Sequence, residues 1–151
     1  MTSDVPRARW RLVDELGGPE ALEALVRDLY DRLYDDLIVG FLFAPHDKAR
    51  LIAHQIEYVR AHLGDREGHY TGRSMRRAHE HLPILPGQFD RRHQILREVL
   101  RDHQAPARVQ QEWIALDLAL RPFVLRMGSE ARERMLLAGR DASSGSRDEE
   151  E

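Results

Sequence analysis

Apolar residues recur at steps of three and four along most of the chain, which is the spacing of one buried face of an α-helix. Proline is well tolerated in the first turn of a helix, so Pro19 indicates the start of a long helix that reaches about residue 34. A shorter helix over 8–16 is expected before it. The apolar face of the long helix is expected to comprise Leu22, Leu25, Val26, Leu29, Leu33 and Leu37.

A second long helix is predicted between Asp47, a residue suited to the N-cap, and Gly64. Its inward face is unusually polar for a core and comprises Leu51, Gln55, Tyr58, Val59 and His62. An amide on such a face costs about 1–3 kcal/mol unless it is hydrogen-bonded, so Gln55 is expected to have a buried partner. Tyr30 is either that partner across a pocket, where it would donate to a bound diatomic molecule, or a tyrosine at the core edge with a solvated hydroxyl.

The rest of the pattern predicts one short helix and two long ones. A glycine-bearing loop over 64–68 leads to a short helical turn at 75–81, which Pro83 must end. A long helix begins at Pro86 and breaks near residue 105, and another follows in which Pro122 should cause a kink. No stretch shows the alternation of apolar and polar residues that marks a strand.

These elements form one all-α domain of about five main helices, which we place at residues 8–128. The segment 129–137 has room for a further turn or two of helix. The small and acidic residues that follow are typical of a solvated chain, so 129–151 is expected to be a C-terminal extension that is largely a disordered acidic tail.

Composition narrows the range of functions. The chain has 151 residues, with 23 Lys and Arg against 26 Asp and Glu, so its charge of -3 gives no footprint for nucleic acid. No stretch approaches the roughly 20 apolar residues of a membrane span, and the polar start lacks a secretory signal, so a cytoplasmic location is expected. With no cysteine in the chain, any metal must be held by His, Tyr or carboxylates.

Histidine is the informative residue type, with eight copies. His79 lies on the predicted short helix, where a neutral imidazole nitrogen could bind a haem iron from one side, although spacing alone does not single it out. His81 is two residues further on, about 200° around a helix, so the two cannot face one iron together. The sequence has no His-Glu-x-x-His pair, which would indicate a zinc site, and no Gly-x-Ser-x-Gly turn, which would indicate a hydrolase. The apolar patch at Phe41, Leu42 and Phe43 is either a core corner or a wall against a flat cofactor.

Four motifs stand in a characteristic order and spacing: Leu16-Gly17-Gly18-Pro19-Glu20-Ala21, Leu29-Tyr30-Asp31-Arg32, Ala53-His54-Gln55 and Tyr70-Thr71-Gly72-Arg73-Ser74-Met75-Arg76-Arg77-Ala78-His79. Together they resemble the group I truncated haemoglobins over about residues 12–125. The last is similar to that family's Tyr-x-Gly-x-x-Met-x-x-x-His. Arg92 stands where the group II and group III proteins usually carry tryptophan, which favours group I.

The resemblance implies a truncated globin fold, a two-over-two helical sandwich around haem b, with His79 as the proximal iron ligand. Tyr30 and Gln55 would be the distal hydrogen-bonding pair, and Leu51 would occupy the usual distal-histidine position. The resemblance also implies that the haem contacts are Phe43, Leu51, His54, Tyr70, Met75, His79 and Phe89.

Two further features of haem attachment concern the role of His54 and the presence of a covalent haem–histidine link. His54 is either a second iron ligand, as in some cyanobacterial relatives with Ala-His-Gln, or a side chain that faces solvent or a haem propionate. The segment 108–125 contains no histidine, so the covalent haem–histidine link of some relatives is not expected.

The implied function is reversible binding of O₂ and of NO and CO, in support of oxygen transport or of nitric oxide detoxification, in which O₂ and NO give nitrate. An unknown reductase would then be a partner, and whether the protein is an enzyme, a nitric oxide dioxygenase, stays open. A monomer or weak dimer is expected, with no nucleic-acid or membrane partner. The alternative is a globin-fold sensor or interaction module that carries no gas.

Overall fold

The helices of the protein begin close to the predicted positions. The computed structural model describes residues 12–63, 77 and 79–144. Its helices are α1 (Leu12–Leu16), α2 (Pro19–Asp35), α3 (Gly40–Phe43), α4 (Lys48–His62), α6 (Pro86–Asp102) and α7 (Ala107–Ser144). Arg77 and His79 are also helical, whereas the predicted loop over 64–68 lies outside the described residues. No strand occurs in the described ranges, and the all-α prediction is confirmed.

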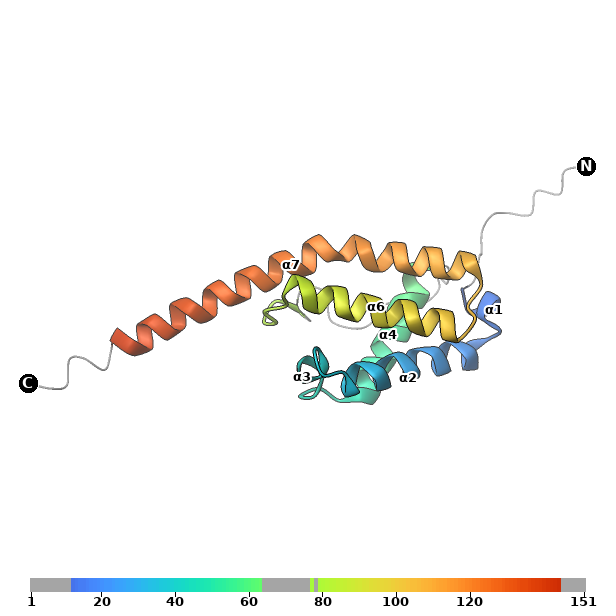
Figure 1. The fold of residues 1–151 in the computed structure, drawn as a ribbon, viewed down its shortest axis with the longest axis horizontal. Coiled ribbons are helices and arrows are strands. Elements are labelled where there is room, and N and C mark those ends of the chain that lie inside the picture. Colours follow the sequence, from blue (N-terminus) through green and yellow to red (C-terminus); the bar gives the residue numbers. More distant parts are fainter. Residues whose placement is uncertain (1–11, 64–76, 78, 145–151) are drawn as a thin grey trace, which may run out of the picture.

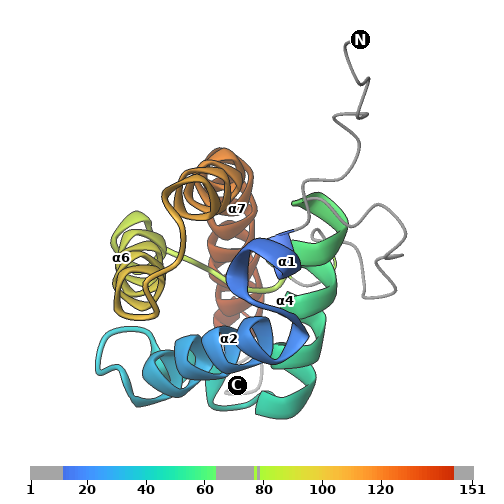
Figure 2. The same cartoon turned by 90° about the vertical axis from the view of Figure 1, so that its right-hand side faces the viewer.

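The helices form two pairs that enclose the core. Helix α2 packs against α4 on one side and α6 on the other, α6 packs along α7, and α1 connects α2 with α7. Figures 1 and 2 show α6 and α7 side by side, with α2 and α4 across from them. This is the two-over-two arrangement that the resemblance implied.

Helix α2 supplies the centre of the core because its apolar face is continuous. Its buried residues are Leu22, Leu25, Val26, Leu29, Tyr30 and Leu33. Each fully buried leucine contributes about 1.5–3 kcal/mol relative to an exposed one. The prediction that Leu37 continues this face is wrong, because Leu37 is fully exposed. The helix ends at Asp35, and the Asp36 carboxylate accepts hydrogen bonds from the amides of Ile38 (3.0 Å) and Val39 (3.1 Å), which turns the chain.

A glycine pair makes the turn from α1 to α2 possible. Gly17 and Gly18 have φ angles of 105° and 116°, a backbone region that residues with a Cβ rarely adopt. The Gly18 amide donates to the Val13 carbonyl at 2.7 Å, which closes the turn. Pro19 then opens α2, as predicted.

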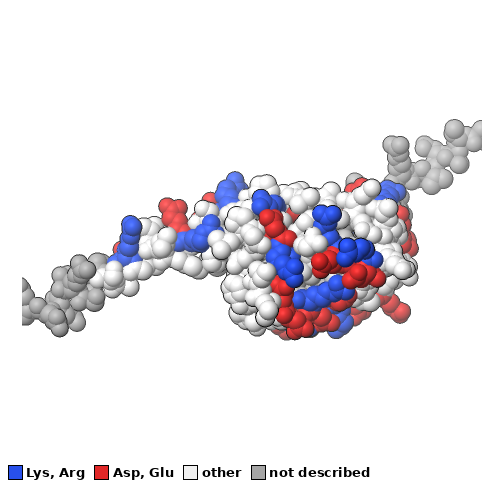
Figure 3. Space-filling view, in the orientation of Figure 1, with Lys and Arg blue, Asp and Glu red and all other residues white. Residues whose placement is uncertain are grey.

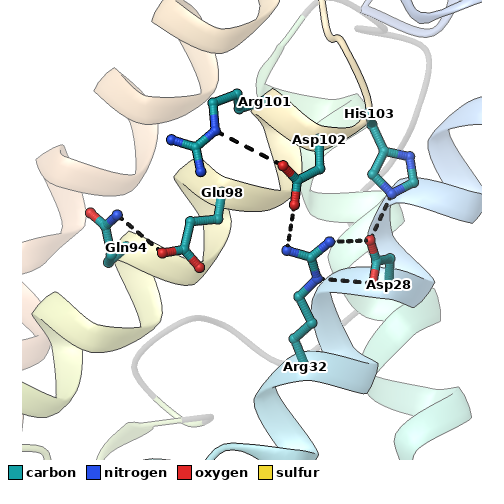
Figure 4. A network of polar contacts seen from close by, with 7 residues as sticks. All are labelled: Asp28, Arg32, Gln94, Glu98, Arg101, Asp102 and His103. Atoms are coloured by element: carbon teal, nitrogen blue, oxygen red, sulfur yellow. Dashed lines mark hydrogen bonds and ion pairs between the residues drawn. The ribbon is translucent and has the colours of Figure 1, made fainter.

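A charged network ties α2 to the end of α6 (Figure 4). Arg32 donates to Asp28 through Nε (3.1 Å) and Nη2 (3.0 Å), and to Asp102 through Nη1 (2.9 Å). His103 Nε2 lies 2.8 Å from the Asp28 carboxylate. The network joins residues 70 and 75 positions apart in sequence and fixes the lateral position of α2 on α6.

Helix α7 is longer than expected. It continues without a break to Ser144, with Pro122 inside it, so the prediction of a largely disordered tail from residue 129 is wrong up to that point. Figure 1 shows its outer half projecting from the body of the molecule. The base of this outer half packs on the chain before α6, because Ala131 is buried and Arg132 Nη1 donates to the Ile84 carbonyl at 3.2 Å.

The surface carries both signs of charge. Figure 3 shows acidic and basic side chains interleaved on the visible face, with no expanse of a single sign. Among the residues described, no helix combines the length and the apolar character that crossing a membrane requires.

Candidate ligand cavity

A cavity of about 630 Å³ lies between the two helix pairs. That volume is within the range of small-molecule and cofactor sites. Most of its wall is apolar, and the apolar side chains that line it are Val39, Leu42, Phe43, Pro45, Leu51, Leu82, Ile84, Phe89, Trp113, Leu116, Leu120 and Val124. They come from α3, α4, α6, α7 and the chain between the helices, so the cavity forms only when the whole fold assembles.

Tyr30 and Phe43 line one part of the wall. Tyr30 is 6% exposed on α2, and its ring meets Phe43 edge to face, with centroids 6.0 Å apart and planes at 89°. Tyr34, one turn further along α2, packs on the same phenylalanine at 5.9 Å but donates its hydroxyl to the His46 carbonyl at 2.7 Å. Of the two tyrosines, only Tyr30 lines the cavity.

Helix α4 presents two adjacent faces. Asp47 caps its start, as predicted, by accepting from the Ala49 amide at 3.0 Å. Ile52 and Val59 are its buried residues and face the core, while the neighbouring stripe lines the cavity. That stripe consists of Leu51, His54, Gln55 and Tyr58. The polar face seen in the sequence is therefore the cavity wall.

One residue of that polar face does not reach the cavity. His62 was predicted to point inward but is exposed, and its Nδ1 lies 2.8 Å from the Tyr58 carbonyl one turn earlier. It is the last residue of α4, beyond the part of the helix that covers the cavity.

Gln55 is half-buried at the cavity, and its amide has no hydrogen-bond partner among the described residues. The sequence led us to expect a buried partner within the protein. An amide left in this position is satisfied only by what the cavity contains.

Four histidines line the cavity: His46 before α4, His54 on α4, and His79 and His81 on the segment before α6. His54 and His79 are half-buried. The His81 side chain is 82% exposed, and its Nε2 lies 3.3 Å from the Glu80 carboxylate. No cluster of three potential metal-ligating side chains occurs in the described part of the chain.

The opposite wall belongs to α6 and α7. Phe89 is 5% exposed there and stacks on His93 with ring planes at 10°. Two further predicted cofactor contacts, Tyr70 and Met75, lie outside the described residues. All the other predicted site residues line the one cavity: Tyr30, Phe43, Leu51, His54, Gln55, His79 and Phe89.

A buried charged cluster in this wall was missed by the sequence analysis. Arg92 Nη1 donates to one oxygen of Asp117 at 2.6 Å, and His93 Nδ1 lies 2.6 Å from the other. Burial raises the pKa of Asp117, but the charge of Arg92 and the hydrogen bonds from His93 and Arg92 outweigh it, so the pKa lies below its usual range. An ionised Asp117 only accepts, so the hydrogen sits on His93 Nδ1.

The sequence contained a signal for this cluster. Asp117 lies four residues after Trp113 and three before Leu120, so it shares their face on α7 and had to be buried with them. A lone carboxylate on an apolar face requires a cation, and Arg92 supplies it.

Known proteins share this fold and sequence pattern. The family model for bacterial-like globins matches residues 11–136. A group 1 truncated haemoglobin of Mycolicibacterium paratuberculosis is 37% identical over 79 residues, which cover 52% of this chain and 57% of that protein. A group 1 truncated haemoglobin of a Synechocystis species is 35% identical over 71 residues, or 47% of this chain and 56% of that protein. The matches thus span little more than half of either relative.

Solved structures agree over more of the chain. The 2/2 haemoglobin of Synechococcus sp. PCC 7002, which carries covalently attached haem, superposes with a TM-score of 0.70 at 25% identity, over 77% of this chain and 98% of that one. The truncated haemoglobin of Tetrahymena pyriformis superposes with a TM-score of 0.66 over 76% of this chain and 97% of that one, and its 23% identity supports the fold alone.

The family model covers far more than half of the sequence, so the chain belongs to the bacterial-like globin family. The resemblance to the group I truncated haemoglobins and the two-over-two helical fold that it implied are confirmed.

Proposed function

We propose that this protein binds haem b in the cavity and uses it to bind O₂ and other diatomic gases, with His79 as the proximal ligand of the iron. The observation that carries the proposal is the joint placement of His79, Tyr30 and Gln55 on the wall of one cavity. The relatives that are named haemoglobins, and the similar structure with attached haem, support it.

The residues of the cavity fit such a group. A porphyrin needs flat apolar walls, which the phenylalanine, leucine and valine side chains supply. Iron in a globin needs an imidazole from one side, and His79 is half-buried at the cavity. The unpartnered amide of Gln55 requires a polar occupant nearby. When bound, the haem supplies the iron that takes the gas.

The protein's own part is to hold and select the gas. The Tyr30 hydroxyl and the Gln55 amide both line the cavity, and both are groups that donate to a diatomic ligand carrying partial negative charge. Buried Tyr30 is held in place by its edge contact with Phe43, so little freedom is lost when it donates. Slow gas release follows from such donation.

The wider functional setting is part of the proposal. Slow release suits nitric oxide detoxification better than bulk oxygen delivery. In that reaction one O₂ and one NO give one nitrate, and a reductase must return one electron to restore the ferrous state. We place this activity in the cytoplasm, where reductants are available.

His54 is the candidate for a second iron ligand. It lines the cavity on α4, and no interaction with another described residue engages its ring. We propose that it is either the second axial ligand in the gas-free protein or a polar contact for the edge of the haem.

The first experiment is the absorption spectrum of haem-reconstituted protein, ferric and dithionite-reduced, beside His79→Ala and His54→Ala. We expect a Soret band that His79→Ala weakens. Resolved bands in the reduced protein that collapse in His54→Ala identify histidines on both sides. A wild-type protein without a Soret band contradicts the proposal and favours a haem-free interaction module.

The distal role of Tyr30 has its own test. Loss of one hydrogen bond to a partly charged ligand is worth about 1–2 kcal/mol, so Tyr30→Phe should speed O₂ dissociation by roughly 5–30-fold in stopped-flow measurements. Tyr34→Phe is the matched control, because it removes a hydroxyl from the same helix and from a ring on the same Phe43, but outside the cavity. Equal rates in the two variants would refute distal donation by Tyr30.

A further inference from the structure

Arg92 is a cation in the wall of an otherwise largely apolar cavity. It projects from α6 with 23% of its side chain exposed, and it lines the cavity together with Tyr30 and Tyr58. Burial lowers the pKa of Arg92, but the charge of Asp117 and the two nearby tyrosines raise it above the ordinary value. The guanidinium is therefore charged whatever the cavity holds.

The ion pair with Asp117 leaves much of this guanidinium unused. Nη1 donates to Asp117, while neither Nε nor Nη2 has a hydrogen-bond acceptor among the described residues. The other half of Asp117 is already taken by His93. Asp117 thus neutralises and holds the arginine, and the remaining N–H donors are left for a further acceptor.

Other charges around the cavity do not satisfy those donors. Apart from Asp117, the cavity wall in the described residues has one carboxylate, Asp47, which is exposed and caps α4. Arg50 and Arg77 also line the cavity, but both are exposed on the surface. The half-buried cation with donors to spare is Arg92.

We infer that Arg92 makes the distal cavity a binding site for small monovalent anions such as azide, fluoride or nitrite, in addition to neutral gases. This inference rests on the proposed haem site, since the anion would bind the ferric iron beside the guanidinium. An anion that enters an apolar cavity loses its hydration, and a held guanidinium replaces it with charge-assisted hydrogen bonds. A neutral gas such as CO gains little from the same group.

The test is a set of spectroscopic titrations of the haem-reconstituted protein. Ferric wild type and Arg92→Gln are titrated with azide, fluoride and nitrite, and the ferrous forms with CO. Loss of a charge-assisted contact should weaken each anion by about tenfold to a hundredfold, with CO affinity changed less than about threefold. Arg121→Gln, which removes the same charge from the exposed pair with Asp90, should leave anion affinity unchanged.

Two further variants guard against loss of folding, because Arg92→Gln leaves Asp117 buried without its cation. The double variant Arg92→Gln/Asp117→Asn removes both charges and should show the same loss of anion affinity. Arg92→Lys keeps the charge without the planar fork and should lie between wild type and Arg92→Gln.

The outcomes separate the two proposals. A wild-type protein without a Soret band refutes the haem site and the anion site together. An intact Soret band with the same azide affinity in wild type, Arg92→Gln and the double variant refutes the anion site alone. Equal losses of azide and CO affinity also refute it, because they would make Arg92 a support for the cavity in general.

Discussion

Replacing Gly128 by alanine should destabilise the protein, although alanine is the better helix former. Gly128 lies within α7 at the point where this helix crosses the chain before α6. A Cβ atom there would lie 2.4 Å from the Ile84 carbonyl oxygen and 2.9 Å from its amide nitrogen. Both are backbone atoms, so no side-chain rotation relieves the overlap.

The magnitude follows from two opposing effects. Forcing one methyl group into a packed site costs about 1–3 kcal/mol, and the upper part of this range is expected where the backbone must move. Removing glycine from a helix interior returns about 1 kcal/mol. The net loss is about 1–2 kcal/mol, which lowers Tm by roughly 2–8 °C for a chain of this length.

Gly139→Ala is the matched control, since Gly139 lies in the same helix with nothing within 4 Å of its added Cβ. Thermal unfolding by circular dichroism should show Tm unchanged or higher for Gly139→Ala and lower for Gly128→Ala. If both variants are as stable as the wild type, α7 does not cross the Ile84 backbone as closely as described.

Two further predictions concern acid stability and haem attachment. Arg91 and the amides of Val39 and Ile38 hold the pKa of Asp36 below its usual range against the effect of burial. That contribution to stability is present above the unfolded pKa of about 3.9 and is lost as pH falls through the lower folded pKa. Asp36→Asn should therefore be less stable than wild type at pH 7 and differ less from it at pH 3 in urea unfolding, and an equal gap at both pH values would contradict the mechanism. Acidified butanone should extract all haem from the reconstituted protein, because the chain has no cysteine and no histidine after His103, and a haem mass that stays on the polypeptide would show otherwise.

The sequence predicted the elements whose signals are local. The α2 face, the Asp47 cap and the Pro86 start each depend on neighbours within one or two helical turns, and each is confirmed. The predicted burial of Leu37 was wrong because the chain turns at Asp36, whose carboxylate accepts hydrogen bonds from the next amides. The spacing of apolar residues does not reveal this turn.

The cavity was predicted only in part, because some of its residues are marked by local motifs and others by contacts between distant helices. Tyr30, Gln55 and His79 were found through motifs, but the charged cluster needs two helices to be placed against each other. Periodicity shows that Asp117 faces inward and does not show that Arg92 is opposite it. The length of helix α7 was underestimated, because its outer residues are polar in composition. The contacts that hold this part of the helix join residues far apart in sequence, such as Arg132 and Ile84, which are 48 positions apart.

The outer half of α7 is anchored to the backbone beside the cavity. Its base is joined to the carbonyls of Glu80 and Ile84 by Arg134 and Arg132, and these two carbonyls belong to the few residues that connect His79 with α6. From Gly128 to Ser144 the helix rises by about 24 Å at 1.5 Å per residue. A force applied to the far end of this helix is therefore transmitted along it to the backbone segment between His79 and α6.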